Sequence, residues 1–245
     1  MIALSTDFLA RLDEDGYAIL PAVFSPAQTD DLARDLTDAL AKATREGIIQ
    51  SQEGTMYAAR NVVALWPPAA TVWQTPPLTN ALRAVLGPDF GLVRVLYFDK
   101  PPQQSWTLPW HKDMTVAVRD NRLPSEQFRR PTFKAGVPHI EAPQHLLERM
   151  LTARLHLDDV TEENGPLKVI PGSHRAGKEL PAGDLPPHTI LASRGDVLLM
   201  RPLLAHCSGH TLPGTLRHRR VLHLEFAASV DLPDGYAWHE FLAPH

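Results

Sequence analysis

Cysteine is almost absent from this chain, because Cys207 is the only one among 245 residues. A single thiol excludes an intrachain disulfide, and it also excludes a cysteine cluster for zinc or iron–sulfur. A bound metal would therefore need histidine and carboxylate ligands. The 12 histidines of the chain make such a site possible.

Two other features are missing: an excess of positive charge and a long apolar run. The formal net charge is -4, which gives no reason to expect a nucleic-acid partner. The apolar stretches are shorter than the roughly 18–20 residues that cross a bilayer, and residues 1–20 are acidic where a signal peptide is basic. We therefore expect a cytoplasmic protein with no membrane partner. Apolar residues make up 44% of the chain, as in ordinary globular domains.

Helix signals are concentrated in the first 90 residues. Residues 25–28 (SPAQ) form a capping-box pattern ahead of leucines at fourfold spacing, which predicts an amphipathic helix up to residue 43. A second helix is predicted over 76–86, since prolines open it and a Gly-Pro pair follows it.

From residue 91 onward, short runs rich in β-branched residues dominate. They predict strands at 91–99, 114–118, 152–160, 166–171, 196–202 and 219–227. Turn signals such as ENG, PGSH and SRGD separate them. This order predicts a mainly β protein with flanking helices, in which an N-terminal helical layer packs on an antiparallel, jelly-roll-like core. Residues 119–143 show little periodicity, so we expect either a functional loop or an irregular cover over the barrel mouth.

Two His-x-Asp pairs occur, His111 with Asp113 and His156 with Asp158. Composition alone predicts roughly 0.8 such pairs, so the pattern is weak evidence by itself. On a strand, residues two apart share a face, and this places the two side chains where both can bind one metal ion. One further histidine would complete the two-histidine, one-carboxylate face of a non-haem Fe(II) site, with open positions for other ligands.

The third ligand has to come from later in the chain. His206 ends an apolar strand, and Ser208 shares its face by alternation. An arginine-rich stretch follows, and guanidinium binds carboxylate through two parallel hydrogen bonds, as a dicarboxylate cosubstrate requires. The His156 pair leaves little chain before His206 for the intervening strands. The His111 pair leaves more, and we favour it.

With these motifs in place, the chain resembles the phytanoyl-CoA dioxygenase family of Fe(II)- and 2-oxoglutarate-dependent oxygenases. The resemblance rests on five stretches: DEDGYAILPAVFSPAQ, YFDKPPQQSWTLPWHKDMTVAV, LDDVTEENGPLKVIPGSHR, RGDVLLMRPLLAHCSGH and HRRVLHLEFA. It implies a double-stranded β-helix core, with His111, Asp113 and His206 as catalytic iron ligands. It also implies that Ser208 and an arginine bind the distal carboxylate of 2-oxoglutarate, and that O2 is consumed.

The identity of that arginine is open between three candidates. Counting back from Phe226 favours Arg219, whereas counting forward from His206 favours Arg217. An extra pair of residues fits more easily into the turn LPGTLRH than into a strand, so we predict Arg219. Arg219 and Arg220 point to opposite faces of a strand, so at least one of these arginines has to be a surface charge.

Further candidates surround this core. On the strand at 152–160, Arg154 is predicted to contact cosubstrate and His156 to contact substrate, unless this polar face lies in water. Lys100 and Trp110 are candidates for the substrate-facing mouth, although a tryptophan is as readily part of the core. The basic residues of 119–143, including Lys134, would steer an anionic substrate or simply form a solvated loop.

The predicted protein is thus one domain over 1–245, with a helical part at about 1–90 and a β-helix core at about 91–230. The resemblance implies hydroxylation of a small molecule with release of succinate and CO2. Because family-like halogenases replace the carboxylate ligand by a small residue, Asp113 favours hydroxylation over halogenation. The alternatives are a non-catalytic barrel that binds a metal or small ligand, and a cupin-like metalloenzyme that does not use 2-oxoglutarate. The substrate and the oligomeric state are not predicted.

Overall fold

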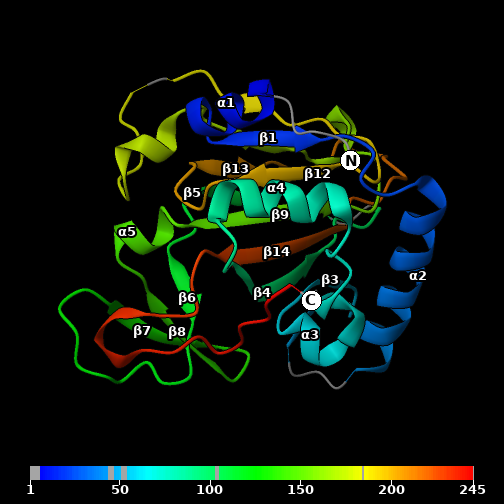
Figure 1. The fold of residues 1–245 in the computed structure, drawn as a ribbon. Helices are drawn as coiled ribbons and strands as arrows, with labels where there is room; N and C mark the ends of the chain where they lie inside the picture. The colour runs from blue at the N-terminus through cyan, green and yellow to red at the C-terminus, as the bar shows by residue number, and fades with distance from the viewer. Residues whose placement is uncertain (1–5, 44–46, 51–53, 103–104, 184, 245) are drawn as a thin grey trace.

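Two antiparallel sheets face each other in this protein, and helices cover the outer side of the larger one (Figure 1). The computed structural model describes residues 6–43, 47–50, 54–102, 105–183 and 185–244. The predicted mainly β fold with flanking helices is confirmed. The two sheets have free edge strands at both ends and do not join into one closed barrel.

The larger sheet has seven strands and the smaller one has four. The order of the first is β1 (Tyr17–Leu20), β12 (Val197–Met200), β9 (Met150–His156), β14 (Val221–Ala227), β4 (Gly91–Phe98), β3 (Met56–Ala59) and β2 (Ile48–Gln50). The order of the second is β11 (His188–Thr189), β10 (Leu167–Val169), β13 (His206–Ser208) and β5 (Leu108–His111). All six predicted strands exist and are shorter than predicted, and β9 begins two residues before its predicted start. The N-terminal part, predicted as helical, also supplies β1, β2 and β3.

The helices and helical turns lie mainly in the first 90 residues. The α-helices are α1 (Thr6–Glu14), α2 (Pro26–Lys42), α3 (Val62–Leu65), α4 (Pro76–Leu86) and α5 (Gln144–Leu147). The 3-10 turns are η1 (Pro67–Ala70), η2 (Glu162–Asn164), η3 (Ser173–Ala176) and η4 (Pro233–Gly235). The capping box of α2 is present, because Gln28 N donates to Ser25 Oγ at 3.3 Å and Ser25 N donates to Gln28 Oε1 at 2.8 Å.

Alternation along the strands separates an apolar outer face from a polar inner face in the seven-stranded sheet. On β14, Leu222, Leu224 and Phe226 face outward and pack with α4, which lies across this side of the sheet (Figure 1). The alternate residues His223 and Glu225 are buried on the other face, toward the four-stranded sheet. The largest core cluster therefore lies between the outer face of the sheet and the helices. Between the two sheets, β9 and β14 contribute polar side chains, whereas β12 and β10 pack together through apolar ones.

A third sheet corrects the expectation for residues 119–143. It has the order β6 (Thr115–Ala117), β8 (Val137–Glu141) and β7 (Arg129–Lys134), so residues 129–141 form a hairpin and residues 119–128 are irregular. Ala135 and Gly136 both have positive φ, 49° and 75°, as in the two-residue turns that suit a hairpin. The prediction failed because Ala-Gly is a weak turn signal and prolines interrupt both strands.

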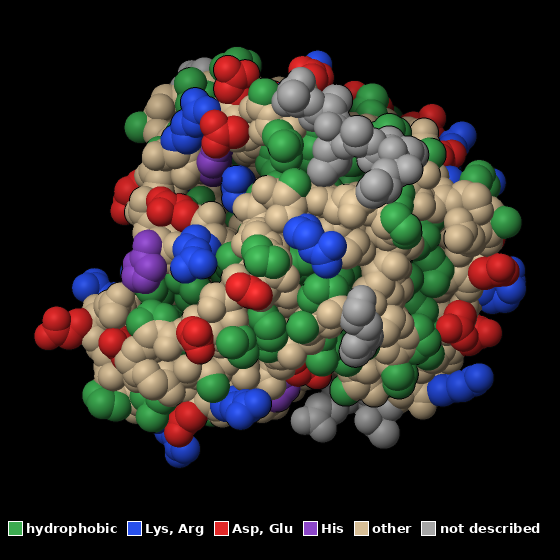
Figure 2. All heavy atoms as spheres, in the orientation of Figure 1, with side chains coloured by type: hydrophobic (Ala, Val, Ile, Leu, Met, Phe, Trp, Pro, Cys, Tyr) green, Lys and Arg blue, Asp and Glu red, His purple; other side chains and the backbone are tan. Residues whose placement is uncertain are grey.

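The surface is mixed in charge. On the face shown in Figure 2, basic and acidic side chains are interspersed and form no single basic patch. In the part of the chain that the structure describes, no helix is both long and apolar enough to cross a membrane.

Candidate metal centre

Three side chains from separate parts of the chain converge between the two sheets. His111 ends β5, His206 begins β13, and the two residues are directly paired across these strands. Their ring centroids lie 4.1 Å apart. Asp113 follows β5, held by a hydrogen bond from its backbone nitrogen to the Pro202 carbonyl at 2.9 Å. One ligand atom from each of the three lies within 4.8 Å of the others.

The ring nitrogens of both histidines are set for metal binding. Nδ1 of His111 donates to the Pro109 carbonyl at 2.7 Å, and Nδ1 of His206 donates to the Leu204 carbonyl at 2.9 Å. These bonds leave Nε2 of each ring as a lone-pair donor. The two Nε2 atoms lie 3.9 Å and 3.7 Å from the Asp113 carboxylate oxygens. This donor set fits a divalent transition metal.

The charge state of the three residues suits a metal as well. Burial opposes ionisation of Asp113, but His206, His223, His111 and Arg94 together lower its pKa to about 2. Burial lowers the pKa of His206 to about 4 despite the attraction of Asp113. At neutral pH the carboxylate is ionised and the buried imidazole is neutral. Asp113 Oδ2 is buried without a hydrogen-bond partner, as expected of an atom that binds an ion.

Lys112, between the ligands His111 and Asp113, holds the segment that carries them in place. Lys112 is buried, and its Nζ donates to the carbonyls of Ser173 at 2.8 Å and Gly177 at 2.7 Å. Ser173 begins η3 within the PGSH stretch, and Gly177 directly follows this turn. The residue separating the two ligands of the His-x-Asp pair thus ties them to the neighbouring turn.

A pair of buried cations lies at one end of the interior. Lys100 and Arg219 exchange two backbone hydrogen bonds of 3.2 Å, so their side chains lie on the same side. Trp106 lies beneath both, with its ring centroid 4.9 Å from Lys100 Nζ and 5.9 Å from Arg219 Cζ. Lys100 Nζ donates to the carbonyl of Gly209, next to the buried Ser208. We call Lys100, Arg219 and Ser208 the anchor end.

Neither cation has an acidic partner within ion-pair distance in the part of the chain that the structure describes. Burial, with repulsion from Arg154, lowers the pKa of Arg219 to about 9, and burial with repulsion from Arg219 lowers that of Lys100 to about 7. Arg219 Nε is buried without a hydrogen-bond partner. Uncompensated cations in a buried place are costly unless an anion joins them. The anchor end therefore fits a carboxylate.

The neighbouring arginines are engaged elsewhere. Arg217 is exposed and lies 3.6 Å from Glu163. Arg220 forms a two-pronged pair with Asp158, at 2.9 Å through Nε and 2.6 Å through Nη2. Among Arg217, Arg219 and Arg220, only Arg219 is buried in the interior without an acidic partner. The second His-x-Asp pair is therefore not part of the metal centre, because its Asp158 binds Arg220.

Gly165 explains the ENG signature near this site. Its φ is +67°, and a Cβ at this position would lie 2.8 Å from both Lys100 Nζ and the Gly209 carbonyl oxygen. A side chain would collide with the backbone and displace the lysine. The glycine thus permits the close approach of Lys100 to the strand that carries Ser208.

A chain of four polar side chains, largely missed from the sequence, crosses the inner face of the seven-stranded sheet. Arg94 on β4 donates to both carboxylate oxygens of Glu225 on β14, at 2.9 Å through Nε. Glu225 Oε1 accepts from His223 Nε2 at 3.2 Å, and His223 Nδ1 accepts from Arg154 Nη1 at 2.9 Å. Alternation within RRVLHLEFA could have shown that Arg219, His223 and Glu225 share a face.

Other predicted residues have mixed outcomes. Arg154 and His156 are buried, so the alternative that this polar strand face lies in water is wrong. Burial, with repulsion from Arg154, lowers the pKa of His156 to about 3. Lys100 lies at the anchor end beside Arg219, whereas it was predicted at the substrate-facing mouth. Trp110 is 36% exposed, which contradicts the core alternative.

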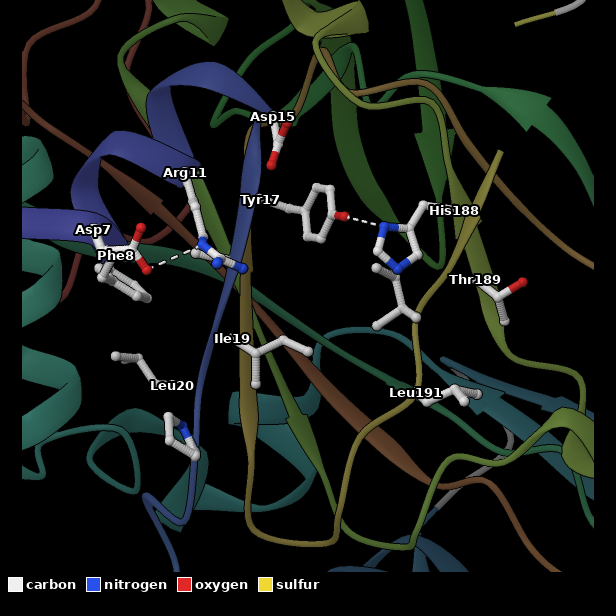
Figure 3. Close-up of a pocket in the computed structure, with 13 residues that line it drawn as sticks. Asp7, Phe8, Arg11, Asp15, Tyr17, Ile19, Leu20, His188, Thr189 and Leu191 are labelled. Carbon is white, nitrogen blue, oxygen red and sulfur yellow. Dashed lines mark hydrogen bonds and ion pairs between the residues drawn. The ribbon is translucent and has the colours of Figure 1, made fainter. Parts of the chain in front are cut away.

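A separate cavity of about 610 Å³ lies where the edge strands β1 and β11 meet α1 (Figure 3). The hydroxyl of Tyr17 and Nδ1 of His188 are hydrogen-bonded across it at 2.6 Å. The charge of Arg11 is met by Asp7 at 3.1 Å. None of the predicted site residues lines this cavity.

Comparison with known proteins agrees with this geometry. Residues 12–218 match the family model described as phytanoyl-CoA dioxygenase. An ectoine dioxygenase from Bordetella parapertussis is 26% identical over 181 residues, which cover 71% of this chain and 50% of that protein. An L-proline trans-4-hydroxylase from Streptomyces griseoviridis is 25% identical over 174 residues, which cover 70% of this chain and 56% of that protein. The chain thus spans about half the length of these relatives.

The fold has solved counterparts. The crystal structure of EctD from S. alaskensis with 2-oxoglutarate and 5-hydroxyectoine has a TM-score of 0.71 with 21% sequence identity. The likeness covers 93% of this chain and 77% of that one. It confirms the predicted double-stranded β-helix fold.

Proposed function

The chain belongs to the phytanoyl-CoA dioxygenase family, and from this premise we propose that it is an Fe(II)- and 2-oxoglutarate-dependent oxygenase that hydroxylates a small molecule. The observation that carries the proposal is the convergence of His111, Asp113 and His206 in a fold that also buries Arg219 without an acidic partner among the described residues. In such a reaction one oxygen atom of O2 enters succinate and the other enters the substrate, and CO2 is released.

In this proposal the triad holds Fe(II), which would supply the oxygen chemistry when bound. The two Nε2 atoms and the Asp113 carboxylate occupy one side of the site, so the remaining positions are open to other ligands. Because Asp113 fills the carboxylate position, hydroxylation is favoured over halogenation. Lys112 keeps the ligand loop in place through the carbonyls of Ser173 and Gly177.

The anchor end would hold the distal carboxylate of 2-oxoglutarate. Arg219 offers its guanidinium, Ser208 a hydroxyl from the opposite sheet, and Lys100 a second positive charge against Trp106. Arg154 lies close enough to Arg219 to lower its pKa, so it adds positive charge to the same region. The similarity to an ectoine dioxygenase, to a proline hydroxylase and to a structure solved with 2-oxoglutarate supports this choice of cosubstrate and a small-molecule substrate.

The proposal can be tested by anaerobic titration of the purified protein with Fe(II) and 2-oxoglutarate. A weak visible charge-transfer band is expected, followed by slow succinate formation after air is admitted. The variant His206→Ala should lose both signals. A protein that binds Fe(II) without a change in the visible spectrum on adding 2-oxoglutarate would fit the cupin-like alternative, and one that binds both but forms no succinate would fit the non-catalytic barrel.

Domain organisation is part of the same proposal. We propose that residues 1–245 act as one domain, since β1 from the N-terminal part pairs with β12 of the seven-stranded sheet. The cytoplasmic location and the absence of nucleic-acid and membrane partners stay predictions.

A further inference from the structure

The interior has a second charged end, six residues further along the segment that contains β14. Arg219 and Glu225 lie on the same side of this segment, and six residues of strand span about 20 Å. Arg94 on β4 and Lys100 just after this strand have the same separation, and the register of β4 places Arg94 opposite Glu225. His223 lies between the two ends, close enough to Asp113 to lower the pKa of that carboxyl. The candidate metal centre therefore faces the middle of a strip that is cationic at both ends.

Lys134 reaches this second end from the β7–β8 hairpin. Its Nζ donates to Thr115 Oγ1 at 2.8 Å, and Thr115 follows Asp113 by two residues. The hairpin turn is fastened to the end of β3 by Asn61 Nδ2, which donates to the Ala135 carbonyl at 3.0 Å. Arg60 precedes Asn61, so the same contact brings Arg60 toward Lys134. We call Arg60, Arg94, Lys134 and Glu225 the hairpin end.

The positive charge of this end exceeds its negative charge. Glu225 is committed to Arg94 through two hydrogen bonds. Arg60 has no acidic partner within ion-pair distance among the residues that the structure describes, and Lys134 bonds only to a neutral hydroxyl there. Burial, followed by repulsion from Arg94, lowers the pKa of both side chains, in the case of Lys134 to about 8. Two cations thus share a partly buried region without a matching anion.

Other basic residues of the same hairpin region behave differently. Arg122 pairs with Asp120 at 2.9 Å, and Arg130 lies 3.3 Å from Glu141. Both arginines are largely exposed. These two arginines are therefore solvated surface charges, which is one of the two alternatives predicted for residues 119–143. Lys134 differs from them because it is partly buried and has no acidic partner among the described residues.

We propose that the primary substrate is a small organic anion whose carboxylate or phosphate group is bound by Lys134 and Arg60 at the hairpin end. This inference rests on the proposed function, since it places the substrate on the side of the metal centre opposite to the 2-oxoglutarate anchor. Guanidinium and ammonium groups bind such anions through charge-assisted hydrogen bonds. Anchoring the charged group at the hairpin end, which lies two residues or about 7 Å along the strand from His223, would present the rest of a small molecule to the metal centre.

The test uses small carboxylic acids and phosphate monoesters, each matched with the amide or alcohol that lacks the anionic group. Binding is measured as a rise in Tm and as a Kd for the full chain under anaerobic conditions, with Fe(II) and saturating 2-oxoglutarate so that the anchor end is filled. At least one anion should bind, and its uncharged counterpart should bind at least about 10-fold more weakly. The set also shows whether carboxylate or phosphate is preferred.

Variants then locate the binding site. Lys134→Gln and Arg60→Gln should each weaken binding of that anion about 10-fold or more, and Lys134→Arg should restore most of it. Arg129→Gln, at an exposed position of the same strand as Lys134, is the matched control and should bind like the wild type.

The inference is overturned if no anion in the set binds, if an uncharged counterpart binds equally well, or if both glutamine variants bind normally. The charge-transfer band of the wild-type protein reports separately on the proposed function. If that band is absent, the proposed function fails; if it is present without discrimination by charge, only the substrate class is wrong.

Discussion

The anchor end and the hairpin end hold similar basic side chains, but they differ in whether a carboxylate of the protein neutralises the positive charge. At the anchor end, Arg219 and Lys100 have no acidic partner among the described residues, and Arg219 Nε lacks any hydrogen bond. At the hairpin end, Arg94 is neutralised by Glu225 in a buried two-pronged pair, whereas the other two cations of that end have no acidic partner among the described residues. A buried cation with its own carboxylate is part of the folded structure. A buried cation without one indicates a ligand.

The metal centre lies between these two ends, and its removal should have the largest effect. Asp113→Ala deletes the only carboxylate of the triad, so Fe(II) affinity should fall by more than about 100-fold, since even outer-shell partners of metal ligands contribute 10- to 100-fold. Succinate formation should become undetectable. Asp158→Ala, in the second His-x-Asp pair, should leave Fe(II) affinity unchanged. Equal metal binding by both variants would contradict the assignment of ligands.

The paired character of the hairpin end can be tested through stability. Glu225→Ala leaves Arg94 buried without a partner, so the free energy of unfolding should drop by about 3–5 kcal/mol. Asp158→Ala breaks a partly exposed pair with Arg220 and should cost only about 1–2 kcal/mol. Urea denaturation of the two variants measures the difference. A loss in Glu225→Ala no greater than that in Asp158→Ala would show that the Arg94 pair contributes little.

The ligand-binding character of the anchor end can be tested through the cosubstrate. Arg219→Gln should raise the KM for 2-oxoglutarate by about 10- to 150-fold, which corresponds to the ~1.5–3 kcal/mol of a hydrogen bond to a charged group. Fe(II) affinity without 2-oxoglutarate should not change. Arg217→Gln is the matched control, because Arg217 lies two residues away on the exposed surface. A KM shift in the Arg217 variant alone would reassign the anchor.

The smallest expected effect is the pH dependence of stability that the buried His156 causes. The pKa of His156 is lowered to about 3, so the unfolded chain takes up a proton below about pH 6.5 while the folded chain does not. Its contribution to stability is therefore full above pH 6.5 and declines as the pH falls toward 3, by at most about 1.4 kcal/mol per pH unit. His156→Gln should flatten the decline between pH 6.5 and 5, as measured by urea denaturation.

His145→Gln, at an exposed position of α5, is the control for this pH series and should keep the wild-type slope. If His156→Gln loses stability with falling pH as steeply as the wild type, the burial of a neutral imidazole at position 156 does not account for the decline.

Sequence patterns correctly predicted those helices and strands that depend on a few neighbouring residues. The capping box of α2, the prolines of α4 and the alternation within β9 and β14 each depend on neighbours along the chain. The β7–β8 hairpin escaped prediction because its turn, Ala135-Gly136, lacks the usual asparagine or aspartate. The chemistry of the triad was predictable from residue types and spacing, because two alternate residues of one segment and one distant histidine can share a metal.

Sequence by itself determined the mainly β class, the residues that could bind a metal and the single face of β14 that carries Arg219, His223 and Glu225. Tertiary structure alone decided which charges are compensated. Arg94 meets Glu225, Arg220 meets Asp158, and Lys134 meets Thr115 only through strand registers and a hairpin that bring distant segments together. Electrostatic energies depend on the distance between charges and on their burial, and neither can be derived from the sequence alone.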